Sequence, residues 1–194
     1  ATHWRSNSVA TVAQTRRMRP NRRPPPPLDG AALERLALRY VERFATTRGK
    51  LAVYLARKVR ERGWEGEAAD PVAIAERFAE LGYVNDLLYA ESKASAMARR
   101  GLGARRVKQA LRHAGVQERD SEALAPQVER RAGETAVAFA RKRRIGPFAE
   151  APADRARVSK QVAAMVRAGH SPELAWKIAR MAPGESVEPL LDED

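Results

Sequence analysis

The chain has 194 residues, of which 44% are hydrophobic and only 6% aromatic, and it carries a formal net charge of +12. Cysteine is absent, which excludes disulfide bonds and thiol catalysis and is typical of a cytoplasmic protein. No apolar run approaches the ~18 residues of a membrane span, and the first residues lack the apolar core of a secretory signal. The positive charge suits a partner rich in phosphate or carboxylate groups.

Both ends of the sequence differ in composition from the middle. Residues 1–28 contain six arginines, four consecutive prolines and no acidic residue, which predicts a disordered basic arm. The alternative is an organelle transit peptide, but the prolines would interrupt its amphipathic helix. Residues 183–194 contain five acidic residues and no basic one, which predicts a solvated acidic tail. A second interpretation is that this tail competes for the basic surface.

Between the ends, apolar residues recur at helical spacing and predict nine helices in three groups. The expected helices lie near residues 31–45, 47–63 and 71–82, then 86–101, 104–114 and 118–125, then 132–144, 154–168 and 172–181. We therefore expect an all-α, elongated array of three tandem three-helix repeats, at residues 29–82, 83–128 and 129–182. One irregular helical domain is the alternative.

Helix start and stop signals support this division. Asp70-Pro71 and Ser171-Pro172 place a capping residue before a proline at the first helical position, and Asp86 is the expected cap of the fourth helix. The three middle helices each end at a glycine, and the glycines lie 52 and 54 residues apart: Gly63, Gly115 and Gly169. Four positions before each glycine stands an apolar residue, namely Val59, Leu111 and Met165.

The aromatic residues are predicted to serve mainly the core. Tyr40, Phe44 and Phe78 fall on apolar stripes, as does Leu81. Trp64 lies in a polar loop, where it either forms an exposed contact or folds back onto the bundle. Trp176 lies in the last helix, and its side cannot be assigned from the pattern. Since aromatics do not interleave with the basic clusters, recognition of single strands by base stacking is poorly supported.

The helix at residues 104–114 has two distinct faces. Arg105, Lys108 and Arg112 cluster within about 60° on a helical wheel, while Val107, Leu111 and Ala114 lie on the opposite side. Six Lys or Arg and no acidic residue occur between positions 99 and 113. We interpret this helix as a surface for a polyanionic or acidic partner, with a merely solvated face as the alternative.

A second basic cluster stands near the end of the seventh expected helix. Basic residues are favoured there by the helix dipole alone, which is the alternative to a binding role. If both clusters line one concave face, they suit a groove in a nucleoprotein filament. The candidate binding surface is Arg99, Arg100, Arg105, Arg106, Lys108, Arg112, Arg141, Lys142, Arg143 and Arg144.

The segment 82–116 contains a specific pattern. A Gly82-Tyr83 turn with an acid at Asp86 starts a helix, an Arg99-x-Gly101-x-Gly103 turn follows, and the helix carrying Arg105-Arg106-Val107 ends in Gly115-Val116. This resembles the central repeat of the RecX family, and residues 51–63 and 140–142 resemble the flanking repeats. The resemblance covers about residues 33–181. Asn85, the lengthened loop at 64–69 and the long N-terminal arm depart from the family pattern.

The resemblance implies tandem three-helix repeats in a bacterial cytoplasmic protein. It further implies binding to filaments of the RecA recombinase, limitation of their growth, and lower ATPase, strand-exchange and co-protease activities of RecA. The expected protein is a monomer that binds no membrane and contacts single- or double-stranded DNA through its basic surface.

Signals for catalysis are weak, and we expect no enzyme, cofactor or metal site. The sequence has no Walker-type phosphate loop, and Gly101-Leu102-Gly103 lacks the strand and third glycine of a dinucleotide site. His3, His113 and His170 are widely separated and form no His-x-x-x-His pair. The rival function is a stand-alone nucleic-acid-binding module of the helix-turn-helix kind, in which Gln109 is a candidate for base reading.

Overall fold

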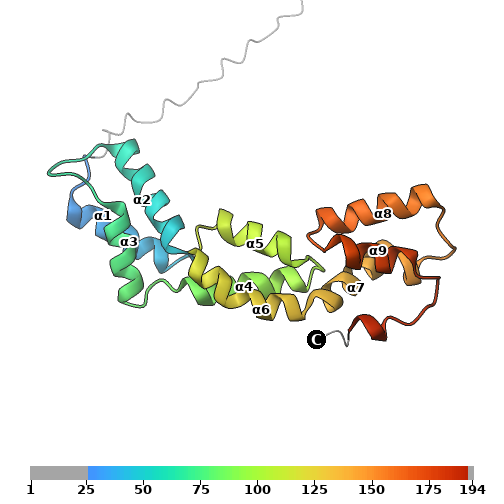
Figure 1. Cartoon of the computed structure of the whole chain (residues 1–194). Coiled ribbons are helices and arrows are strands. Elements are labelled where there is room, and N and C mark those ends of the chain that lie inside the picture. Colours follow the sequence, from blue (N-terminus) through green and yellow to red (C-terminus); the bar gives the residue numbers. More distant parts are fainter. Residues whose placement is uncertain (1–25, 192–194) are drawn as a thin grey trace, which may run out of the picture.

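The computed structural model describes residues 26–191, and its regular elements in that range are helices joined by loops. Nine α-helices and two short 3-10 helices form an elongated array, and the described residues contain no strand beyond an isolated bridge between Leu28 and Trp64 (Figure 1). Three separate clusters of buried residues follow one another along the chain. The predicted all-α array is confirmed. The predicted disorder of residues 1–25 lies outside the described residues.

Unit 1 contains α1 (Gly30–Val41), α2 (Arg48–Arg62) and α3 (Pro71–Glu80). Leu33, Leu51, Leu55 and Phe78 form its core. Leu28 is completely buried in the same cluster, although the sequence placed it in the arm. Its N–H donates to the carbonyl of Gly63, and its own carbonyl accepts from the N–H of Glu65, so the chain is already anchored at the residue that directly follows the prolines.

Unit 2 contains α4 (Asp86–Ala98), α5 (Ala104–His113) and α6 (Glu118–Arg130). Helix α6 continues through Pro126, five residues beyond the predicted end at Ala125. A proline costs the helix one hydrogen bond. Leu124 and Val128, on either side of it, pack into the apolar cluster of this unit and hold the helix together.

Unit 3 contains α7 (Ala132–Arg143), the 3-10 helix η1 (Gly146–Phe148), α8 (Arg155–Arg167) and α9 (Pro172–Arg180). After α9 the chain returns across α7 and forms a second 3-10 helix, η2 (Glu188–Leu190) (Figure 1). The described part of the acidic tail is therefore not simply solvated, because Leu190 is buried in the core of this unit. Residues 192–194 of the predicted tail lie outside the described residues.

Three local predictions in units 1 and 2 are wrong. Helix α1 ends at Val41, so Phe44 leaves the apolar stripe and is 56% exposed. Leu81 follows the end of α3 and is 62% exposed, because the chain turns before its side chain can face the core. Asp86 is not the cap of α4; Asn85 accepts the N–H of Leu88 in that role, and Asp86 is buried.

The units are joined where their middle helices meet end to end. The N–H of Gly103, at the start of α5, donates to Ala168 at the end of α8 over 3.0 Å, and that of Arg105 donates to Gly169 over 3.2 Å. Free N–H groups at one helix start thus satisfy free carbonyls at another helix end. A Cβ on Gly103 would collide with the backbone of Gly169, so the contact requires glycine at this position.

The junction between units 1 and 2 repeats this arrangement with side chains added. The start of α2 meets the end of α5, where the Thr47 hydroxyl donates to the Ala114 carbonyl and Gly49 faces Gly115. Arg48 forms ion pairs with Asp86, Glu76 and Asp120, from α4, α3 and α6. Burial opposes the charge of Arg48, but the carboxylates outweigh it and raise its pKa above the ordinary value.

Candidate functional site

Helix α5 presents the two faces that its sequence predicts. Val107, Leu111 and Ala114 are buried in unit 2. The basic residues on the other side of the helix are exposed, namely Arg105, Arg106, Lys108 and Arg112. The apolar face fixes the helix on the bundle, so the charges project outward.

A groove runs between the outer face of α5 and the end of α8. It has a volume of about 420 Å³ and is lined by five basic residues and no acidic one. The basic residues are Arg105, Arg106, Lys108, Arg112 and Arg167, and the rest of the lining is Gln109, Val166 and Gly169. We call this the α5–α8 groove. Both helices lie along the same side of the array, away from α4 and α6 (Figure 1).

Sequence reasoning missed the contribution of α8. Its 13 residues include four basic and no acidic side chains, and all four are exposed: Arg155, Arg157, Lys160 and Arg167. The absence of acidic residues from this helix is a sequence signal for a basic surface, and the same signal identifies α5. What the sequence could not show is that the end of α8 meets α5, which places Arg167 beside Arg105 and Arg106 in one groove.

Two groups in the α5–α8 groove have partners within the molecule. Lys108 pairs with Glu118 at the start of α6 over 2.9 Å, and this hydrogen bond lowers the pKa of Glu118. The acid-free run in the sequence is therefore partly balanced by an acid from the next helix. Arg106 donates to the Gln109 side chain over 2.9 Å, so this glutamine, the candidate for base reading, already accepts a hydrogen bond.

The other predicted residues are exposed but do not line this groove. Arg99 and Arg100 lie at the turn between α4 and α5. Of the cluster at the end of α7, Arg141 lies 5.1 Å from the Phe148 ring and Arg143 5.8 Å from that of Phe139. Arg144 pairs with Glu150 over 2.7 Å. Three of these four cations thus contact side chains of their own unit.

His170 is a buried titratable group beside the groove. It directly follows Gly169, its Nε2 lies 3.1 Å from the Gly101 carbonyl oxygen, and its ring lies 5.6 Å from that of Phe139. Burial lowers the pKa of His170 below its ordinary value, and the hydrogen bond to Gly101 offsets only part of this effect. The neutral imidazole therefore acts as a donor that closes the junction between units 2 and 3.

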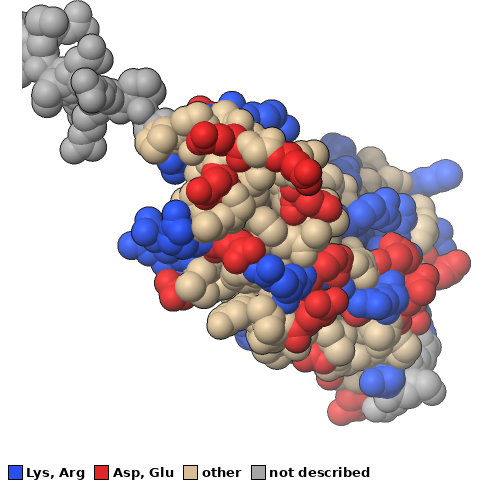
Figure 2. All heavy atoms as spheres, turned by 90° about the vertical axis from the view of Figure 1, so that its left-hand side faces the viewer, with Lys and Arg blue, Asp and Glu red and all other residues tan. Residues whose placement is uncertain are grey.

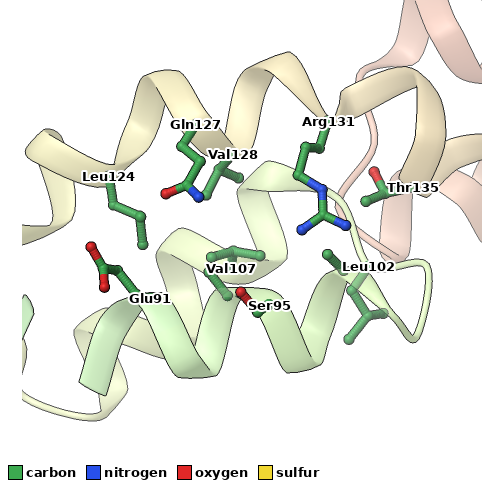
Figure 3. Close-up of a pocket in the computed structure, with 11 residues that line it drawn as sticks. Glu91, Ser95, Leu102, Val107, Leu124, Gln127, Val128, Arg131 and Thr135 are labelled. Atoms are coloured by element: carbon green, nitrogen blue, oxygen red, sulfur yellow. The ribbon is translucent and has the colours of Figure 1, made fainter. Parts of the chain in front are cut away.

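The described residues also enclose a small cavity between α4 and α6. The cavity between α4 and α6 has a volume of about 20 Å³, room for a single water molecule, with Glu91 and Ser95 on one side and Gln127 and Arg131 on the other (Figure 3). Among residues 26–191, no cluster of three or more metal-ligating side chains occurs. None of the helices described is long and apolar enough to cross a membrane.

Charge is distributed unevenly along the array. Residues 29–84 carry ten basic and nine acidic residues, whereas residues 131–182 carry eleven basic and four acidic ones. Figure 2 looks onto the end of the molecule formed by unit 1, and acidic and basic side chains intermingle there. Within residues 29–182 the excess of positive charge is therefore larger in unit 3 than in unit 1, and residues 1–25 carry six further arginines.

An elongated helical array of this kind places the chain in the class of helical-repeat proteins. Comparison with known proteins narrows the class. Residues 85–123, which span α4, α5 and the start of α6, match the family model for the second three-helix domain of RecX. The chain is 34% identical over 163 residues to the Regulatory protein RecX of Myxococcus xanthus (strain DK1622), covering 78% of this chain and 86% of that protein. The chain therefore belongs to the RecX family of regulatory proteins.

Proposed function

We propose that this protein binds the RecA–DNA filament and restrains its growth, and thereby lowers the ATPase, strand-exchange and co-protease activities of RecA. The observation that carries the proposal is the α5–α8 groove, with five basic side chains and no acidic one on an elongated array. Membership of the RecX family supports RecA as the partner. The protein acts as a cytoplasmic monomer, and its basic residues also contact DNA.

The mechanism uses binding energy alone. Basic side chains in the groove pair with phosphates or carboxylates on the wall of the filament groove, where charge complementarity sets orientation and speeds association. A protein seated there disfavours the addition and retention of RecA subunits. The contact residues we propose are Arg99, Arg100, Arg105, Arg106, Lys108, Arg112, Arg141, Lys142, Arg143 and Arg144, with Arg167 added from α8.

The test is the ATPase rate of RecA on single-stranded DNA, with this protein titrated at substoichiometric ratios. We expect inhibition well below one protein per RecA. Changing Arg105, Lys108 and Arg112 together to Ala should weaken the inhibition about tenfold or more, because three charge-assisted contacts are lost. A matched variant removes three exposed charges elsewhere, Arg35, Arg39 and Arg130, and should inhibit like the wild type.

Two other results contradict the proposal. Inhibition that begins only when the DNA itself is saturated indicates competition for DNA, and the nucleic-acid-binding module becomes the better description. Its affinity for DNA then falls steeply with salt, in proportion to the phosphates contacted. No inhibition at any ratio removes the proposed function altogether.

A further inference from the structure

A second groove lies at the other junction, between the end of α1 and α4. It has a volume of about 550 Å³ and lies on the surface between Phe44, Tyr83 and Leu88. We call it the Tyr83 groove. These three side chains are 56%, 56% and 62% exposed, and the adjacent Leu81 is 62% exposed. Exposed apolar residues that cluster around a hollow are typical of a docking surface, whereas single apolar residues scattered over a surface are not.

A buried hydroxyl in the lining lacks a partner. Thr46 is only 6% exposed, yet its Oγ1 forms no hydrogen bond within the protein. It lines the Tyr83 groove, whereas the neighbouring Thr47 hydroxyl is satisfied by Ala114. Buried polar groups are rarely left unpaired, because each costs free energy. The Oγ1 atom is covered by the lining, so a peptide that opens the lining slightly on docking would supply the backbone N–H or carbonyl that this hydroxyl lacks.

The charge of the groove lining indicates which charge the bound peptide carries. Lys93, on the exposed face of α4, is the one charged residue among those that line the Tyr83 groove. The protein's own N-terminal residues 1–25 carry six arginines and no acidic residue, so they bring the wrong charge. The complementary occupant carries large apolar side chains and an acidic residue beside them.

We propose that the Tyr83 groove binds an apolar, acid-bearing peptide segment of the RecA subunits in the filament. This rests on the proposed function for the identity of the partner, but it assigns a second and chemically different contact. The α5–α8 groove then meets the charged wall of the filament, while the Tyr83 groove binds a protein segment through apolar side chains, the Thr46 hydroxyl and Lys93. The two grooves lie at the two junctions of the array.

The experiment measures affinity of the full chain for RecA filaments and, separately, for bare single-stranded DNA. Phe44→Ala combined with Leu88→Ala should lower affinity for the filament about tenfold or more, because truncating central apolar contacts has effects of this size. Binding to bare DNA should stay within about twofold. The matched control is Val53→Ala with Val72→Ala, two valines that are 68% and 61% exposed and lie outside the groove.

A substitution at Thr46 separates binding from folding. Thr46→Val keeps the shape of the side chain and removes the unpaired hydroxyl, so the melting temperature should stay the same or rise. Affinity for the filament should nevertheless fall severalfold, because the peptide loses a partner. Lys93→Glu should also lower that affinity, and more so at low salt.

Three outcomes of these experiments would overturn the proposal for the Tyr83 groove. If the Phe44 and Leu88 variant binds filaments like the wild type while the Arg105, Lys108 and Arg112 variant does not, the Tyr83 proposal is overturned and the proposed function stands. If sedimentation shows that the wild type self-associates and that only the Phe44 and Leu88 variant is monomeric, the occupant is a second copy and the proposal is again overturned. If the wild type does not bind filaments, the proposed function falls and this inference falls with it.

Discussion

At the scale of single residues, the junctions between units contain buried polar side chains whose roles in the structure differ from those that the sequence predicts. Asp86 resembles a helix cap in the sequence, but it is buried and its Oδ1 accepts the backbone N–H of Arg48 over 2.9 Å. The neighbouring Asn85 caps the helix instead. A pattern of capping residues locates the helix start to within one residue, but the choice between the two side chains depends on a partner 38 positions away.

His170 gives the junction between units 2 and 3 a dependence on pH. Because its pKa in the folded protein is below the ordinary value of 6.5, the unfolded chain binds a proton that the folded chain does not. The free energy of unfolding is fully retained above that value and falls as the pH drops below it. We expect wild-type stability in urea to decrease between about pH 7.5 and about pH 5.5.

His170→Gln isolates this effect, because the amide can still donate to the Gly101 carbonyl but does not titrate. The variant should lose less stability over the same pH range than the wild type. His113→Gln, at an exposed position, should keep the wild-type slope. Equal slopes for all three proteins would contradict the role assigned to His170.

At the scale of helices, the amphipathic pattern predicted most of the fold. The glycine stops after α2, α5 and α8 and the capping pairs before α3 and α9 fixed those ends to within a residue or two. The basic face of α5 was also predictable, since its apolar stripe determines which side faces out. The groove that it forms with α8 was not, because the contact joins residues more than 60 positions apart through backbone atoms.

The position of the C-terminal segment, like the α5–α8 groove, was not predictable from the sequence. The acidic residues dominate the composition of this segment and indicate a solvated tail. Its position in the structure is determined instead by one leucine. Leu190 is 4% exposed and Leu191 is 44% exposed, although they are identical in type and adjacent in sequence. The backbone of Leu190 lies against Gly133 of α7, where any side chain larger than hydrogen would collide with it.

This pair provides a direct test of the tail. Leu190→Ala should lower the free energy of unfolding by about 2 kcal/mol or more, as large-to-small changes in a core do. Leu191→Ala should change it by less than about 0.5 kcal/mol, as at an ordinary surface position. Urea denaturation followed by circular dichroism measures both, and equal effects would show that the segment does not dock.

At the scale of the whole molecule, the array behaves as linked units whose stability depends on their junctions. Gly103→Ala introduces a methyl group against the backbone of Gly169, and the backbone cannot move aside like a flexible side chain. We expect a loss of about 1–3 kcal/mol, as for overpacking elsewhere, and a broader urea transition as unit 3 uncouples from unit 2.

Gly30→Ala is the matched control, because a Cβ there meets no atom within 4 Å. At this exposed first position of α1, alanine should leave the protein unchanged or stabilise it by up to about 1 kcal/mol. If Gly103→Ala is equally harmless, the close backbone contact does not couple the two units.

The end-to-end meeting of the middle helices has an electrical consequence. The carbonyl end of α8 meets the N–H end of α5, and the carbonyl end of α5 meets the start of α2. The peptide dipoles of successive helices therefore follow one another in the same sense instead of cancelling as they do in antiparallel pairs. The row formed by α8, α5 and α2 therefore has its positive pole near Asp154 and its negative pole near Gly63. A helical filament also has unlike ends, so under the proposed function we expect this row of helices to dock in one direction along it.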